Sequence, residues 1–230
     1  MTIAERIDPI RQRIEQTALS VGRDPAGIRL VAVTKTVPAD NIRAAMAAGI
    51  DIFGESYLQE SKPKIEALAD MPATWHFIGH LQSKKAKDAV RYFDLIHSVD
   101  RFKLAAALDR HAETIGKVQD ILIQVNLSGE QTKSGLAKDE TTDMIIEISR
   151  LAHVRIRGLM TLPPFFDEAA ERVRPYFAAL AALRDRIEAL HIDNICMQEL
   201  SMGMTGDFEV AVQEGATLVR IGTAIFGERA

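Results

Sequence analysis

The sequence predicts an α/β fold in which a parallel sheet closes into a (β/α)8 barrel, the TIM-barrel architecture. Short runs rich in β-branched residues alternate with longer stretches of helical periodicity, and repeated strand-helix units form parallel sheets. Eight such runs occur within 230 residues, which fits a closed barrel at the small end of its usual size. An open, doubly wound sheet is the alternative, because the pattern alone does not establish closure.

The first expected element is a helix over residues 1–20. Its apolar residues Ile3, Ile7, Ile10 and Ile14 recur every three or four positions, the spacing of one helix face. Only eight residues follow the last expected strand, which is too few for a full helix. We therefore expect this additional N-terminal helix to cover part of the outer wall of the barrel.

The strands and the remaining helices follow in alternation. The strand candidates are residues 28–36, 51–54, 74–79, 95–99, 120–127, 155–161, 195–201 and 217–222. The clearest helical patterns are residues 40–48, 101–115, 140–152 and 167–190. No linker rich in proline, glycine and serine, and no repeat, divides the chain, so residues 1–230 are expected to form a single domain.

Composition excludes several classes of protein. The 28 basic and 32 acidic residues give a net charge of −4, without the basic surface of a nucleic-acid-binding protein. No apolar run approaches the roughly 18 residues that span a membrane, and residues 1–30 lack the apolar core of a signal peptide. A single cysteine excludes an internal disulfide framework. We expect a cytoplasmic protein without nucleic-acid or membrane partners, and a monomer, since no apolar helix face is left uncovered.

Lys35 is the first candidate site residue. Barrel enzymes build their sites at the carboxyl ends of the strands, and the first strand ends in Thr34, Lys35 and Thr36. Alternation places Lys35 on the same face as Val31 and Val33. If that face is the barrel interior, burial lowers the pKa of the amine, as a lysine that forms a Schiff base requires. The alternative is a lysine whose amine reaches back to solvent.

A phosphate site is expected after the last two strands. Residues 200–207 contain two glycines, and the hydroxyls of Ser201 and Thr205, and the final strand ends in Gly222 and Thr223. Glycine lets a ligand approach the backbone closely, and hydroxyls donate hydrogen bonds. The loops after strands seven and eight are the usual phosphate-binding position of this fold.

Arg220 lies within an otherwise apolar strand, on the same face as Leu218 and Gly222. A buried arginine keeps its charge and requires a partner. Two readings are open at this point. One is an ion pair inside the barrel with Glu55 or Glu199, and the other is a hydrogen bond to an acceptor atom on a ligand.

Seven stretches, in order over nearly the whole chain, resemble the pyridoxal 5′-phosphate (PLP) homeostasis proteins, the proline-synthase-co-transcribed family, which is similar to the N-terminal domain of alanine racemases. The stretches are Val31–Lys35, Phe53–Glu60, Trp75–Gln82, Asn126–Glu130 with Lys133–Gly135, Arg157–Thr161, Leu200–Met204 and Val219–Gly227. The resemblance implies a barrel of fold type III that carries PLP as its cofactor.

The resemblance also implies roles for individual residues. Lys35 would hold the cofactor as an internal aldimine, and Arg220 would face the pyridine nitrogen. The implied phosphate ligands are Ser201, Thr205, Gly222 and Thr223, with the backbone of Met204. The family usually has asparagine where this chain has Ser56, so Ser56 is an expected cofactor contact whose side-chain role is open. Lys84 also replaces a usual asparagine, at a position expected to face solvent.

The implied function is a PLP carrier and regulator rather than an enzyme. The protein would buffer PLP through a reversible lysine aldimine, release it to PLP-dependent apo-enzymes or salvage enzymes, and so regulate intracellular vitamin B6 and amino-acid homeostasis. An arginine opposite the ring nitrogen favours an unprotonated ring, which stabilises carbanions less.

A PLP-dependent amino-acid racemase is the alternative function. Racemisation needs a second acid or base on the face opposite the lysine, which related racemases supply as a tyrosine from an additional β domain that we do not expect here. Tyr57, Tyr92 and Tyr176 are all expected in helices, and Tyr57 is the candidate nearest a strand end. A phosphosugar enzyme that uses the same phosphate site is a third reading.

Two further features of the sequence are weaker indications of function. His76 and His80 are four residues apart but flank a strand end, so no metal site is expected. Lys133 lies on a loop at the same end of the barrel, where it would be a second amine for PLP or a solvated surface lysine.

Overall fold

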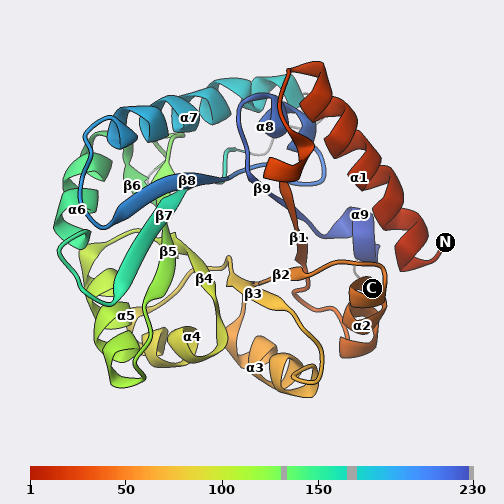
Figure 1. Cartoon of the computed structure of the whole chain (residues 1–230), viewed down its shortest axis with the longest axis horizontal. Coiled ribbons are helices and arrows are strands. Elements are labelled where there is room, and N and C mark those ends of the chain that lie inside the picture. The colour runs from red at the N-terminus through yellow and green to blue at the C-terminus, as the bar shows by residue number, and fades with distance from the viewer. Residues whose placement is uncertain (131–133, 165–169, 228–230) are drawn as a thin grey trace.

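In the computed structural model, eight parallel strands form a closed barrel (Figure 1). The model describes residues 1–130, 134–164 and 170–227. The barrel strands are β1 (Arg29–Val33), β2 (Ile52–Glu55), β3 (Thr74–Phe77), β4 (Leu95–Val99), β5 (Gln119–Asn126), β7 (Val154–Met160), β8 (Ile195–Ser201) and β9 (Leu218–Ile221). Their order around the ring is β4-β3-β2-β1-β9-β8-β7-β5, and β4 pairs with β5 to close it. The predicted barrel is confirmed, and the open sheet is excluded.

The strands differ from the sequence prediction in detail. A two-residue strand, β6 (Leu136–Ala137), pairs with the end of β5 and was not predicted. The first strand ends at Val33 instead of Thr36, because the chain turns at Lys35 and Thr36 and the φ angle of Thr36 is 63°. A residue in the left-handed region does not continue an extended strand.

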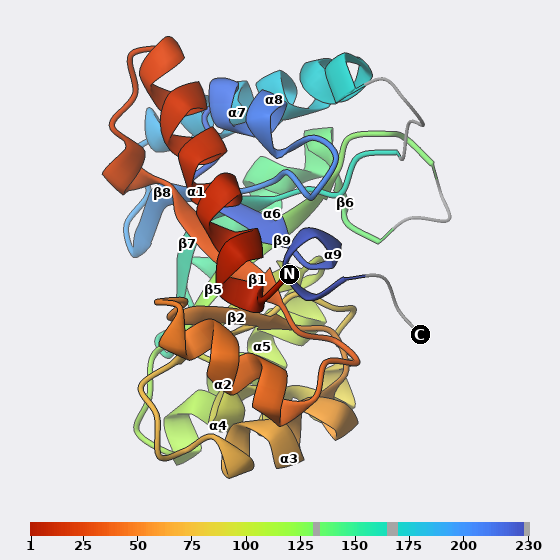
Figure 2. The same ribbon diagram turned by 90° about the vertical axis from the view of Figure 1, so that its right-hand side faces the viewer.

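Helices surround the barrel (Figures 1 and 2). They are α1 (Ile3–Ser20), α2 (Ala39–Ala47), α3 (Leu58–Ala67), α4 (Ala86–Tyr92), α5 (Phe102–Thr114), α6 (Thr141–Ile148), α7 (Arg174–Glu188), α8 (Phe208–Gln213) and α9 (Thr223–Phe226). The predicted helix over 167–190 begins at Arg174, after a 3-10 turn at Ala170–Val173, and residues 167–169 lie outside the described part of the chain. Within the described residues, no helix has both the length and the apolar composition needed to cross a bilayer.

The additional N-terminal helix lies where it was predicted. Thr2 and Glu5 form a capping box that begins α1, with the Thr2 N–H donating to Glu5 Oε2 at 2.8 Å. Ile7, Ile10 and Ile14 bury one face of the helix. This helix packs against α2, α8 and α9 on the outer wall (Figure 2), so it covers the side of the barrel where α9 has only four residues.

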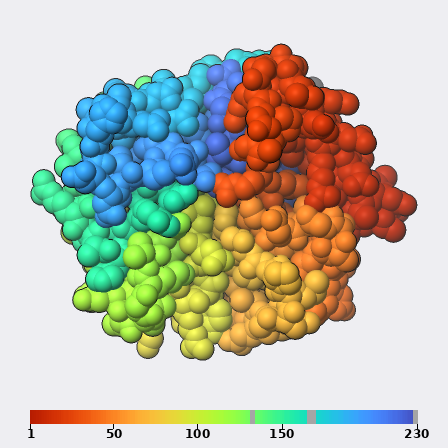
Figure 3. All heavy atoms as spheres, in the orientation of Figure 1, coloured from red at the N-terminus to blue at the C-terminus, as the bar shows by residue number. Residues whose placement is uncertain are grey.

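The barrel interior is apolar at its amino-terminal end. One cluster of buried side chains, contributed by six of the strands, fills this part of the interior: Val31, Ile52, Leu95, Leu122, Met160 and Leu218. In the space-filling view of Figure 3, atoms fill the barrel centre on the face shown. A larger cluster packs between the strands and the helices. Because the interior is filled from one end, the polar side chains that point inward nearer the carboxyl ends of the strands face the opposite opening.

Gly158 of β7 lies against the backbone of Glu199 on β8. The pairing register of the two strands shifts between Ile156 and Gly158, and the φ angle of Gly158 is 151°. A Cβ atom added at Gly158 would lie 1.9 Å from the carbonyl oxygen of Glu199, far inside van der Waals contact. The irregular pairing therefore depends on the missing side chain.

We predict that Gly158→Ala lowers the free energy of unfolding by about 3 kcal/mol or more, because the methyl group forces two strand backbones apart and the φ angle becomes strained. Urea denaturation followed by circular dichroism measures this change. The control is Gly27→Ala, where no atom lies within 4 Å of the added Cβ and the expected change is below about 0.5 kcal/mol. Equal stabilities of the two variants would contradict the prediction.

Candidate functional site

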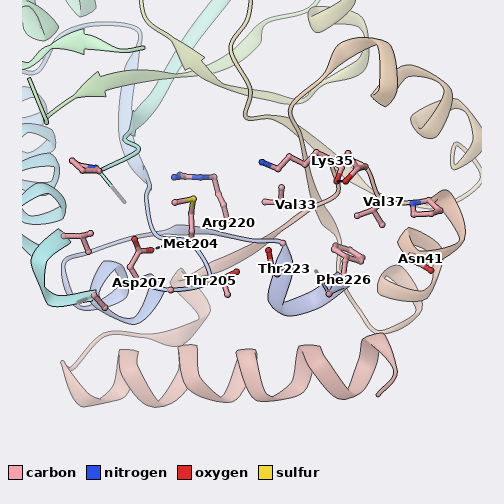
Figure 4. Close-up of a pocket in the computed structure, with 18 residues that line it drawn as sticks. Val33, Lys35, Val37, Asn41, Met204, Thr205, Asp207, Arg220, Thr223 and Phe226 are labelled. Carbon is pink, nitrogen blue, oxygen red and sulfur yellow. Dashed lines mark hydrogen bonds between the residues drawn. The ribbon is translucent and has the colours of Figure 1, made fainter. Parts of the chain in front are cut away.

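A cavity of about 590 Å³ opens at the carboxyl ends of β1, β8 and β9. Its walls come from the segments that follow these strands, which include Asn41 and Phe226 (Figure 4), and from the segment after β7, which contributes Pro164, Ala170 and Val173. Six of the residues predicted from the sequence line it together: Lys35, Met204, Thr205, Arg220, Gly222 and Thr223. The barrel therefore collects these side chains into one site.

Lys35 enters this cavity from the turn after β1. Val33 and Lys35 line the cavity, while Val31 belongs to the apolar cluster beneath it, so the predicted shared inward face is confirmed. Lys35 is half-buried. Figure 4 shows its amine extended toward the side of the cavity that holds Arg220. The amine thus points into the cavity instead of to the outer wall.

A buried ionic cluster lies behind this turn, on the outer side of the barrel. Lys64 of α3 donates from Nζ to Glu55 Oε1 at 2.6 Å, to Glu60 Oε1 at 2.7 Å and to the carbonyl oxygen of Thr34 at 2.7 Å. Burial raises the pKa of Glu55, although hydrogen bonds from Lys64 and Thr34 act in the opposite direction. Within the described residues, Glu55 Oε2 is buried without a hydrogen-bond partner, so Lys64 is the cation that stabilises this carboxylate.

The same cluster holds the backbone on both sides of Lys35. Thr34 contributes its carbonyl to Lys64, and its hydroxyl donates to Glu55 Oε1 at 2.8 Å. On the other side, the N–H of Thr36 donates to Glu60 Oε1 at 2.5 Å. A left-handed threonine costs of the order of 1 kcal/mol and persists only where its surroundings fix it. The cluster therefore fixes the turn that directs Lys35 into the cavity.

Arg220 is buried in the neighbouring strand, with 4% of its surface exposed. It pairs in register with Val31 of β1, so it points into the barrel as predicted. Its guanidinium donates from Nη1 to Ser201 Oγ at 2.5 Å and from Nη2 to the carbonyl oxygen of Thr161 at 3.0 Å. Burial lowers the pKa of Arg220 to about 10, which still leaves the guanidinium charged at neutral pH.

The ion-pair reading of Arg220 is wrong. Glu55 pairs with Lys64, and Glu199 pairs with Arg29 and accepts a hydrogen bond from Thr217 Oγ1 at 2.7 Å. In residues 1–130, 134–164 and 170–227, no carboxylate forms a salt bridge with Arg220. The cation is instead held by two neutral oxygen atoms, and it lines the cavity.

The opposite side of the cavity is rich in hydrogen-bond donors. Thr205 and Thr223 contribute hydroxyl groups there, and no described acceptor in the protein receives the backbone N–H of Thr205 or Gly206. The N–H of Met204 is used within the loop, donating to Asp207 Oδ1 at 2.6 Å. Burial raises the pKa of Asp207, although this hydrogen bond and the charge of Arg220 act against that change.

Two predicted residues lie elsewhere. The Ser201 hydroxyl is fully buried between Arg220 and His97, with Oγ 2.9 Å from His97 Nδ1, and Ser201 is not among the described residues that line the cavity. Ser56 follows β2 and also lies outside that lining. Tyr57 precedes α3, so the expectation of a helix there is wrong, and its side chain is exposed.

Other expectations can now be placed. His76 contacts His97, with 3.0 Å between His76 Nδ1 and His97 Nε2, and His80 Nδ1 lies 3.3 Å from Ser134 Oγ. The described part of the chain contains no group of three acidic, histidine or cysteine side chains that could hold a metal ion. Lys133 lies outside the described residues.

Sequence reasoning missed several residues of the site. Asn41, Asp207 and Phe226 also line the cavity, eight, six and five residues after the ends of β1, β8 and β9. Their position after strand ends was the signal available in the sequence. Lys64 and Glu55 were missed as a pair. Their contact joins a helix to a strand end, and no local pattern predicts it.

Residues 7–230 match the family model described as "Alanine racemase, N-terminal domain". The chain is 42% identical over 229 residues to the pyridoxal phosphate homeostasis protein of Aquifex aeolicus, covering 100% of this chain and 99% of that protein. It is 45% identical over 228 residues to the protein of the same name from Pseudomonas aeruginosa, covering 99% and 96%.

Solved structures give the same picture of the fold. PipY of Synechococcus elongatus, in the structure with PLP bound, is 38% identical with a TM-score of 0.87, covering 98% of this chain and 100% of that one. Alanine racemase of Clostridium difficile is 14% identical with a TM-score of 0.66, covering 95% of this chain and 56% of that one. The second likeness concerns the fold alone.

We predict that Lys64→Met destabilises the protein by about 3–5 kcal/mol at pH 8, because Glu55 is left as a buried charge without its cation. The loss should be smaller at pH 5. The folded-state pKa of Glu55 is already raised, so the folded protein binds this proton more tightly than the unfolded chain, and stability falls as pH rises between the two pKa values. Without Lys64 the pKa of Glu55 in the folded protein rises further, so the decline in stability continues to higher pH.

Urea denaturation at both pH values measures this effect. Lys62→Met is the matched control, because Lys62 lies on the same helix and pairs with Asp88 at 3.0 Å on the surface, where such pairs contribute less than about 1 kcal/mol. A Lys64 variant as stable as the Lys62 variant at pH 8 would show that Glu55 does not depend on Lys64.

Proposed function

Because this chain belongs to the pyridoxal phosphate homeostasis protein family, within the alanine racemase N-terminal domain family, we propose that it is a PLP carrier that binds PLP reversibly and buffers its concentration. It would act as a monomeric, single-domain cytoplasmic protein that releases PLP to apo-enzymes or salvage enzymes. Through this supply it would regulate intracellular vitamin B6 and amino-acid homeostasis without strong catalysis of its own.

The observation that carries this proposal is one cavity that contains an amine, a buried guanidinium and a set of hydroxyl donors. These groups match the aldehyde, the pyridine nitrogen and the phosphate of PLP, respectively. About 590 Å³ is within the usual range for small-molecule sites and leaves room beyond a ligand of PLP's size. When bound, PLP supplies an aldehyde that condenses reversibly with amines.

Lys35 would supply the amine for that covalent bond. It is half-buried at the cavity wall, and the Lys64 cluster fixes the turn on both sides of it. A fixed backbone limits the number of positions that the amine can occupy. That restriction favours bond formation with a ligand already held by its phosphate.

Arg220 would face the ring nitrogen. A guanidinium only donates hydrogen bonds, so Arg220 would hold the ring nitrogen as an acceptor without a proton. An unprotonated ring withdraws fewer electrons and stabilises a carbanion poorly. This arrangement supports binding more than catalysis.

The phosphate would lie against Thr205, Gly222 and Thr223, beside the loop that carries Met204. The hydroxyls and the available N–H groups of this loop suit an anion with several acceptor oxygens. We assign Ser201 no phosphate contact, since its hydroxyl is hydrogen-bonded to Arg220 and His97. Ser56 likewise receives no cofactor role.

The carrier is favoured over an amino-acid racemase by the side chains around the cavity. Racemisation needs an acid or base on each face of the substrate. Among the described lining residues there is no tyrosine or histidine, and Asp207 is the one carboxylate, held by the N–H of Met204. Tyr57 is exposed outside this lining.

Lys35→Ala should abolish the visible absorption band of the protein loaded with PLP, and sodium borohydride should no longer attach the cofactor permanently, because the amine that binds the aldehyde is gone. Absorbance and intact-mass measurements test this. Lys84→Ala removes an exposed lysine and should retain both signals. Permanent attachment of the cofactor to the Lys35 variant would show that another lysine forms the covalent bond. A wild-type protein that stays colourless with PLP would favour the phosphosugar enzyme.

L-alanine and other amino acids are incubated with the PLP-loaded protein in deuterium oxide. We predict that the protein exchanges the Cα proton of these amino acids more slowly than about 0.01 s⁻¹, which is three orders of magnitude below a typical enzyme turnover. The reason is that the described lining residues include no tyrosine or histidine to act as the second acid or base, and that the N–H of Met204 holds Asp207. Proton NMR measures the exchange, and chiral chromatography measures the D-isomer. Exchange at more than about 1 s⁻¹ would make the protein a racemase.

A further inference from the structure

A chain of buried polar side chains crosses the barrel interior just beneath the cavity. It begins at Arg220 on β9, continues through Ser201 on β8 and His97 on β4, and ends at His76 on β3. The exposed fractions of these four side chains lie between 0% and 4%. The apolar cluster of the barrel interior includes Val31 and Met160, the register partners of Arg220 and Ser201, so the polar side chains border both this cluster and the ligand cavity that Arg220 lines.

The two histidines of this hydrogen-bonded chain, His76 and His97, are neutral. Burial, together with the smaller effect of the charge of Arg29, lowers the pKa of His76 to about 3. Burial also holds the pKa of His97 well below its ordinary value, with His76, Arg220 and Arg29 acting in the same direction. A neutral imidazole has one nitrogen that donates and one that accepts.

Because each neutral ring donates from one nitrogen and accepts at the other, the donor in each hydrogen bond of this chain can be assigned. Arg220 only donates, so Ser201 Oγ accepts from it and has one proton left to donate. If that proton goes to His97 Nδ1, the other nitrogen of His97 carries a proton and donates to His76 Nδ1. The reverse direction would send two donors to Ser201 and leave its own proton without any acceptor among the described residues. Since a buried donor without an acceptor is costly, the first direction is favoured.

We propose that Ser201, His97 and His76 are positioning residues for Arg220, with the histidine pair orienting the Ser201 hydroxyl so that its lone pair faces the guanidinium. The carbonyl oxygen of Thr161 holds the second nitrogen of the guanidinium from β7. Two fixed acceptors define the plane of the group beside the cavity that Arg220 lines. The consequence for PLP rests on the proposed function, in which Arg220 meets the ring nitrogen.

The direction of the chain is tested without PLP. In ¹⁵N-labelled apo-protein at pH 7, two-bond ¹H–¹⁵N spectra should give His97 and His76 as neutral rings protonated at Nε2. The two rings are assigned from the signals that disappear in His97→Asn and in His76→Asn. A proton on Nδ1 of His97, or a charged ring, would overturn the proposal.

The action on Arg220 is tested with a double-mutant cycle. Ser201→Ala should weaken PLP binding about tenfold, as expected for a lost hydrogen bond to a charged group, and should shift the visible band. In an Arg220→Lys background, the same substitution should change the affinity less than about twofold, because Ser201 acts through the guanidinium. The positioning role would be refuted if Ser201→Ala lowered the affinity for PLP equally in the two backgrounds. It would also be refuted if Ser201→Ala left the affinity of the protein with Arg220 unchanged.

Ser98→Ala is the matched control for the cycle. Ser98 is buried beside His97 on β4, and its Oγ has no hydrogen-bond partner among the described atoms, so its removal deletes a buried hydroxyl without touching the chain. It should leave the affinity and the spectrum unchanged. The thermal unfolding temperature of each apo-variant identifies any general loss of folding. If the parent protein itself binds no PLP, the proposed function fails, while the NMR result still decides the direction of the chain.

Discussion

The site depends on a cation that is buried inside the barrel and forms no salt bridge with a carboxylate among the described residues. Removing a guanidinium from water costs several kcal/mol unless hydrogen bonds replace its hydration. Ser201 and the carbonyl of Thr161 replace part of that hydration, and the rest must come from the cavity that Arg220 lines. An acceptor atom of a ligand at this position would add a further hydrogen bond to the guanidinium. In the function that we propose, the nitrogen lone pair of the pyridine ring would supply this acceptor.

The strand pairing carries the geometry of the two main groups. Val31 pairs with Arg220 across β1 and β9, and Lys35 lies four residues beyond Val31, so backbone hydrogen bonds fix the distance between the origins of the two side chains. Separate networks then fix their directions. The Lys64 cluster acts from the outer side of β1, and the Ser201–His97–His76 chain acts from inside the barrel. A substitution in one network should leave the other intact, because they share no residue.

The two-residue period of the strands explains what the sequence could predict. It placed Lys35 and Arg220 on inward faces and located the loops around Thr205 and Thr223, because those inferences need only alternation and strand order. The partner of Arg220 was not predictable. Ser201, His97 and His76 lie on three different strands, and their meeting depends on the stagger of the closed barrel. The sequence prediction extended the first strand to Thr36, beyond its observed end at Val33. The difference arises because Glu60 of α3 binds the N–H of Thr36 and fixes its left-handed conformation. Even so, His97 carried the same signal as Arg220, a polar residue on an inward strand position, and could have been recognised by it.

The arrangement also supports the carrier function that we propose over catalysis. Catalysis on this kind of cofactor depends on an electron-poor ring and on groups that move protons near the substrate. Here the group proposed to meet the ring nitrogen is a donor that stays charged at neutral pH, and the histidines nearest to it are kept neutral and buried beneath the cavity, away from any substrate. Their protons are engaged in orienting one hydroxyl. Binding energy in such a site goes into holding the ligand in place, and little is left for stabilising a carbanion, which is what reversible storage of a reactive aldehyde requires.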